Sequence, residues 1–119
     1  MGMDLIGANP TTKKGEYFRN NVWWWHPLWD YCSFIAPEIC NKVTHAHSND
    51  GDGLDKNDSK KLAKLLNESL KDGTANKYIS ERNKRIAREK SWEVNYQIDE
   101  NNINMFVKFL RGCGGFSIL

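Results

Sequence analysis

Residues 22–29, Val-Trp-Trp-Trp-His-Pro-Leu-Trp, contain four of the five tryptophans of the chain. Tryptophan has the largest apolar side chain, and its indole N–H requires a hydrogen-bond partner when the ring is buried. Three consecutive tryptophans do not all face one core, because a strand sends neighbouring side chains to opposite faces and a helix turns them by about 100° per residue. The run therefore predicts core packing for some rings and a surface position, or a second cluster, for at least one.

The overall composition indicates a single globular domain over residues 1–119. The chain has 39% hydrophobic residues, 27% charged residues and a net charge of +2, and this length is enough for a core without metals or disulfides. The three cysteines form no CxxC pair, which favours a reducing compartment. There is no cationic-then-apolar leader and no run of about 18 apolar residues. We expect a soluble, cytoplasmic protein that does not contact a membrane.

The positive charge is concentrated in the middle of the chain. Residues 54–90 carry eleven Lys and Arg against six Asp and Glu, whereas both flanking parts are mildly acidic. Such a block contacts phosphate or an acidic partner, or it is simply the solvated face of charged helices. We favour the solvated face, because a nucleic-acid interface would also need interleaved aromatic residues and only Tyr78 qualifies.

The first third of the chain predicts one strand and one helix. Residues 3–6 form a short apolar segment closed by turn-forming residues, and residues 9–21 are polar enough to be a loop. Pro27 suits the first turn of a helix, because its missing N–H would be unpaired there in any case. Apolar residues then recur at helical spacing until Pro37 ends or restarts the helix.

The middle third predicts a loop followed by two helices. Residues 44–55 are a loop by composition, and Asp55, Asn57 or Asp58 can cap a helix that runs to about residue 70. Its expected buried stripe consists of Leu62, Leu65, Leu66 and Ser69 or Leu70. A further helix over about residues 75–90 has a narrow apolar stripe and a broad basic face, so we expect only partial burial.

The last third predicts a strand, a helix and a strand. Residues 92–98 alternate apolar and polar side chains, which is typical of a strand with one buried face. Asp99 is then the expected cap of a helix that Gly112 ends, and residues 114–119 are the closing strand. The two strands form a parallel pair through a right-handed crossover, or belong to a mixed sheet. We predict an α+β domain with a small sheet of about three strands packed against about four helices.

Several stretches carry a family resemblance: Met1-Gly2-Met3-Asp4-Leu5, Gly15 to Trp25 (Gly-Glu-Tyr-Phe-Arg-Asn-Asn-Val-Trp-Trp-Trp), His47 to Leu54, Phe109-Leu110-Arg111 and Gly114 to Ile118. Together they resemble a group of small proteins encoded by bacteriophages and prophages. The resemblance spans most of the chain and is weakest over about residues 73–91. It implies a phage setting in a bacterial host, and no catalytic residues or zinc ligands come with it.

In that setting the sequence favours a non-enzymatic binding protein, an inhibitor of host defence that binds a host immune protein or sequesters a signalling nucleotide. No cofactor is expected, and a homo-oligomer stays open as the assembly state. The candidate binding residues combine an arginine and tryptophans, which suit phosphate and base stacking, with a His/Asp-rich loop. They are Arg19, Trp23, Trp24, Trp25, His26, His45, His47, Asn49, Asp50 and Asp52.

Two alternatives stay open for these residues. His45, His47 and Asp50 could form a divalent metal site of a hydrolase, although the Asn-Asp-Gly-Asp-Gly run is also typical of a turn before a capped helix. For the aromatic run, Trp23, Trp25 and Trp29 could be core residues with Arg19 packed over an indole ring. We expect two or three of the four tryptophans in the core and the remainder at the surface. A nucleic-acid-binding accessory protein using residues 77–90 is the third possibility.

Overall fold

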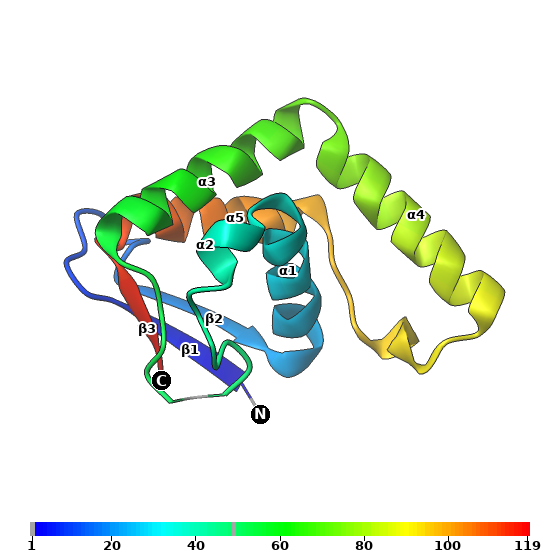
Figure 1. Cartoon of the computed structure of the whole chain (residues 1–119), viewed down its shortest axis with the longest axis horizontal. Helices are drawn as coiled ribbons and strands as arrows, with labels where there is room; N and C mark the ends of the chain where they lie inside the picture. Colours follow the sequence, from blue (N-terminus) through cyan, green and yellow to red (C-terminus); the bar gives the residue numbers. More distant parts are fainter. Residues whose placement is uncertain (1, 49) are drawn as a thin grey trace.

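An antiparallel sheet occupies one side of the molecule in the computed structural model (Figure 1), which describes residues 2–48 and 50–119. Within these residues the strands are β1 (Gly2–Gly7), β2 (Tyr17–Asn21) and β3 (Phe116–Ile118), in the order β2-β1-β3. Leu5 of β1 lies opposite Phe18 of β2 and Ile118 of β3. These three side chains are buried, so they form the floor of the core.

Helices cover the inner face of this sheet. They are α1 (Val22–Ile35), α2 (Pro37–Cys40), α3 (Lys56–Lys71), α4 (Thr74–Glu89) and α5 (Glu100–Gly112), with a short 3-10 helix η1 (Trp92–Asn95) before α5. α3 packs along α5, and both α1 and α5 contact the sheet. Trp25 of α1, Leu66 of α3 and Phe106 of α5 are fully buried and meet in one core. The predicted α+β class is therefore confirmed.

Helix α1 begins five residues before the proline that was expected to start it. The side chain of Asn21 accepts hydrogen bonds from the backbone N–H groups of Trp23 and Trp24, so it caps the helix at Val22. Pro27 lies inside the helix and has no N–H to offer the carbonyl of Trp23 one turn earlier. That carbonyl accepts instead from the backbone N–H of Gln97 at 2.9 Å. Because Pro27 cannot donate to it, the carbonyl of Trp23 is available to bind the backbone of Gln97, which lies in the segment between α4 and α5.

The predicted caps of α3 and α5 are confirmed. The side chain of Asp55 accepts from the backbone N–H of Asp58, and that of Asp99 accepts from Asn102. Leu62, Leu66 and Ser69 are buried as expected, whereas Leu65 is 37% exposed, so its predicted burial is wrong.

Two segments differ from their predicted structure. Residues 17–21, expected to be loop, form β2, because Phe18 packs between Phe106 and Phe109 of α5 with ring centroids at 5.1 and 5.7 Å. Residues 92–98, expected to be a strand, form η1 followed by a short stretch of irregular chain. No strand of the described sheet pairs with them, and β3 pairs antiparallel with β1, so the expected parallel pair is also wrong.

Helix α4 leaves the body of the molecule, as Figure 1 shows on the right. Gly73 turns the chain between α3 and α4 with φ of +88°, a conformation that favours glycine. After α4 the return segment, residues 90–99, runs back to α5. The side chains that α4 buries are Ala75, near its start, and Ile86. Partial burial of this helix was predicted and is confirmed.

Candidate functional site

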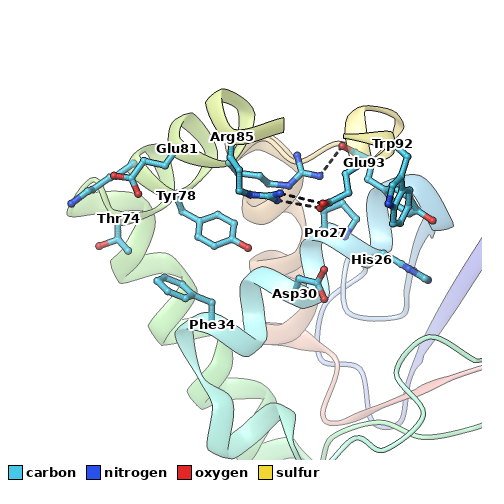
Figure 2. Close-up of a pocket in the computed structure, with 13 residues that line it drawn as sticks. His26, Pro27, Asp30, Phe34, Thr74, Tyr78, Glu81, Arg85, Trp92 and Glu93 are labelled. Atoms are coloured by element: carbon cyan, nitrogen blue, oxygen red, sulfur yellow. Dashed lines mark hydrogen bonds and ion pairs between the residues drawn. The ribbon is translucent and has the colours of Figure 1, made fainter. Parts of the chain in front are cut away.

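A cleft of about 720 Å³ lies between α1, α4 and η1 (Figure 2). Helix α1 lines it with His26, Asp30 and Phe34, which share one face because they are four residues apart. Helix α4 lines the opposite wall with side chains from Thr74 to Arg85. The volume lies within the range of about 300–1,000 Å³ that is usual for small-ligand sites. This cleft is therefore the candidate functional site.

The return segment closes one end of the cleft through ion pairs and hydrogen bonds to α4. Arg85 donates two hydrogen bonds, each of 3.2 Å, to the two carboxylate oxygens of Glu93. Arg82 donates to the carbonyl of Tyr96 at 2.9 Å. The bond from Arg85 holds the pKa of the Glu93 carboxyl below its usual value and raises that of the guanidinium. Burial lowers the pKa of Arg82.

Aromatic rings line both ends of the cleft. At one end Phe34 and Tyr78 lie 5.0 Å apart, and Phe34 is 60% exposed. At the other end Tyr96 lies 5.5 Å from Trp92, which is 73% exposed, and 4.8 Å from Trp23. Exposed rings that gather in one place, rather than lying scattered over the surface, are typical of ligand or partner sites. The two clusters provide flat surfaces on which a planar group can stack.

The cleft has equal numbers of positive and negative side chains, but only some of them form ion pairs. Three cations, Lys77, Arg82 and Arg85, and three carboxylates, Asp30, Glu81 and Glu93, line it. Arg85 and Glu93 neutralise each other. Asp30, by contrast, makes no hydrogen bond or ion pair within the part of the chain that the structure describes. Its carboxylate is therefore available to a ligand.

Two imidazoles lie in contact beside the cleft. The rings of His26 and His47 have centroids 3.9 Å apart, and His26 also stacks on Tyr96 at 5.7 Å. Partial desolvation of the His47 ring by the groups packed around it lowers its pKa, and the charge of His26 lowers it further, whereas Asp30 acts in the opposite direction. The contact joins the loop after α2 to the wall of the cleft, so the predicted His-rich loop reaches the site through His47.

The other residues of that loop do not gather around His47. His45 is exposed, and its backbone N–H donates to the carboxylate of Asp52 at 2.8 Å, which makes Asp52 a turn-stabilising residue. Asp50 is exposed, and Asn49 lies outside the described residues. Among residues 2–48 and 50–119, no three His, Cys, Asp or Glu side chains are placed to hold a metal ion. The structure thus gives the hydrolase alternative no metal-binding cluster in these parts of the chain.

The arginine and tryptophans predicted to act together are divided between two places. Arg19 lies on the open face of the sheet, where it pairs with Asp4 at 2.6 Å. Trp24 is half-buried and lines a shallower hollow of about 400 Å³ that Arg19 also lines. Trp23, by contrast, is exposed beside the main cleft. The main cleft therefore receives Trp23 only at its edge and no contact from Arg19.

The remaining tryptophans of the run belong to the core. Trp25 is fully buried and donates its indole N–H to the carbonyl of Ala46 at 2.8 Å. Its ring stacks on that of Trp29, which is 4% exposed, at a centroid distance of 5.4 Å. The expectation of two or three core tryptophans is met by these two. Trp23, which the core interpretation included, is 45% exposed and does not belong to the core.

Sequence reasoning missed most of the lining of the cleft. Phe34 gave a weak signal, since it falls beside the apolar positions of α1 rather than on them. Trp92 and Tyr96 were assigned to the buried face of a strand, yet Trp92 is the most exposed of the large hydrophobic side chains. Asp30 gave no signal. Tyr78 was noted as the aromatic residue of the basic segment 77–90, the third alternative, but nothing in the sequence shows that this segment faces α1 across a cleft.

The cysteines do not contribute to the site. Cys32, Cys40 and Cys113 are buried, and burial raises the pKa of each thiol, that of Cys40 to about 11. Their thiols are therefore protonated near neutral pH and are poor nucleophiles.

In the described part of the chain no helix has the length and apolar character needed to cross a membrane. Comparison of the chain with known protein families, curated proteins and solved structures gave no match.

Proposed function

We propose that this protein is a phage-type binding protein that inhibits host defence by sequestering a signalling nucleotide in the cleft between α1 and α4. The observation that carries the proposal is the combination of exposed aromatic rings with cations in one cleft. Aromatic rings stack on nucleobases, and Lys and Arg bind phosphate. The protein then acts in proportion to its amount, without turnover.

The cations of the cleft differ in their freedom to bind phosphate. Arg82 and Arg85 both hold the return segment: the charge of Arg85 is neutralised by Glu93, whereas Arg82 donates to a neutral carbonyl and keeps its positive charge. Lys77 lines the cleft and is exposed, and no ion pair within the described residues engages it. Lys77 is thus the side chain we expect to contact a ligand phosphate directly.

The exposed rings favour a second candidate, a host protein as the partner. Phe34, Trp92 and Val94 are each at least 60% exposed, and all three lie on α1 or η1 beside the cleft. Exposed aromatic side chains are frequent anchors of protein interfaces. A protein partner predicts binding that depends on Trp92 and only weakly on salt, because little net charge is involved.

The test is thermal unfolding of the purified protein with a panel of nucleotides. At a ligand concentration of 100 times Kd, binding stabilises the folded state by about 2.7 kcal/mol, which corresponds to a rise in Tm of roughly 10 °C for a chain of this length. The Lys77→Gln variant should lose most of this rise. Lys84→Gln is the matched control, because Lys84 is also exposed on α4 but does not line the cleft.

Two results would contradict the proposal. The first is the absence of a Tm shift with every nucleotide, together with a host protein that co-purifies with the wild type and not with Trp92→Ala; this outcome supports the second candidate. The second is release of hydrolysed nucleotide over many turnovers, which would make the protein an enzyme.

A further inference from the structure

Asp30 is the carboxylate that α1 contributes to the cleft, and within the described residues it makes no hydrogen bond or ion pair; Glu81, on α4, is likewise unpaired. Glu93 accepts hydrogen bonds from Arg85 and Ser91, and Arg82 donates to the carbonyl of Tyr96. Asp30 makes no such contact among the described residues, although it projects from α1 into the cleft (Figure 2). A carboxylate in this position offers two acceptor oxygens to a ligand.

Two acceptor oxygens side by side are matched by two parallel N–H donors on a planar group. Guanine presents this pair on its Watson–Crick edge, from its ring N1–H and its exocyclic amino group. Adenine, cytosine and uracil each place a lone pair next to a donor on the same edge, and that lone pair repels a carboxylate. A free carboxylate therefore discriminates among bases in favour of guanine.

The surroundings of Asp30 suit a flat base attached to phosphate. Tyr78 lies across the cleft from Asp30, on α4 (Figure 2), and Tyr96 lines the same cleft, so aromatic rings are available for stacking. Lys77 lies on α4, one turn before Glu81, on the same side of the cleft as Arg82. A base on Asp30 would thus leave its phosphate near the cations of α4.

We propose that the cleft is selective for guanine nucleotides and that Asp30 is the residue that reads the base. This inference rests on the proposed function, since it names the ligand class of the same site. The guanidinium group of an arginine side chain also offers two parallel N–H donors. We favour the nucleotide because the cleft also offers the exposed ammonium of Lys77, which suits a phosphate and has no counterpart on an arginine ligand.

The experiment measures the affinity of the full chain for GTP, ITP, XTP and ATP by calorimetry. ITP lacks the exocyclic amino group and should bind about tenfold more weakly than GTP, since one hydrogen bond to a charged acceptor is lost. ATP should bind about 100-fold more weakly than GTP, because its edge also opposes a lone pair to the carboxylate.

Variants of two carboxylates make the assignment specific. Asp30→Asn should lose the preference for GTP and should bind XTP more tightly than the wild type does, because the amide N–H₂ matches the carbonyl that replaces the amino group in xanthine. Glu81→Gln is the control: Glu81 lines the same cleft from α4, and the preference for GTP should persist. Unchanged Tm values without ligand would show that both variants are folded.

The outcomes separate the two proposals. ATP binding as tightly as GTP, or a GTP preference that survives Asp30→Asn, would overturn the assignment of Asp30 and leave nucleotide sequestration standing. No binding of any of the four nucleotides, nor of the wider panel above, would overturn both. Binding of an arginine-containing peptide that Asp30→Asn abolishes, with no nucleotide binding, would also overturn the guanine assignment.

Discussion

Replacing tryptophan by phenylalanine should destabilise the protein strongly at Trp25 and only slightly at Trp23, two positions away. Trp25→Phe removes an indole N–H that donates to the buried carbonyl of Ala46 at 2.8 Å. Leaving a buried acceptor without its donor costs about 1–3 kcal/mol. The smaller ring also leaves part of a fully buried site empty, next to Trp29 and Phe106, at a further cost of roughly 1–2 kcal/mol.

These terms place the loss of unfolding free energy for Trp25→Phe at about 2–5 kcal/mol. For a chain of this length, 1 kcal/mol corresponds to roughly 4 °C in Tm, so the expected fall in Tm is about 8–20 °C. Trp23→Phe should lower Tm by less than about 3 °C, because Trp23 is 45% exposed and its ring contact with Tyr96 survives the change. The exchange of tryptophan for phenylalanine is identical in the two variants.

The assay is thermal unfolding followed by circular dichroism at 222 nm, with the wild type measured in the same buffer. A similar small shift in both variants would show that Trp25 is not held in the core as described. A larger loss for Trp23 than for Trp25 would refute the division of the aromatic run into a buried and an exposed part.

Two further predictions concern the walls of the cleft. Glu93→Gln removes the negative charge to which Arg85 donates two hydrogen bonds. Because this ion pair is partly exposed, the change should lower Tm by no more than about 3 °C. It should nevertheless weaken ligand binding severalfold, as measured by calorimetry. Unchanged binding would show that the return segment does not shape the site. The pKa of His47 in the folded protein lies below the value of an unfolded histidine, so the unfolded state takes up more protons as the pH falls and stability should decrease from pH 7.5 to 5. His47→Gln should flatten this dependence in urea unfolding at several pH values and His45→Gln should not; equal profiles for the two variants would contradict the contact seen here.

The parts of the fold that were predictable are those that short-range chemistry determines. Asp99 was recognised as a cap, and Asp55 was one of three candidates, because an N-cap needs only its own side chain and the next three residues. The exposure of Leu65 and the burial of Phe18 depend on which element packs against them, and local sequence patterns do not indicate that long-range packing. The alternation in residues 92–98 is a strand pattern, but a strand also needs a neighbour to pair with.

The candidate site was predictable where it coincides with the aromatic run and, through the third alternative, with the basic segment 77–90. Trp23 and His26 were singled out and do lie at the cleft, and His47 reaches it through His26. Asp30 and Tyr78 are 48 residues apart in the sequence and meet only because α4 turns back towards α1. The orientation of two helices across a cleft is a long-range property, and neither periodicity nor composition encodes it locally.

The partial burial of α4 has a consequence for the dynamics of the molecule. With Ala75 and Ile86 as its buried side chains, α4 should open at a lower free-energy cost than α5, which buries a continuous stripe. Its amide hydrogens should therefore exchange with solvent well before those of α5. A ligand that bridges α1 and α4 would slow this exchange, so α4 should gain more protection on binding than α5 does.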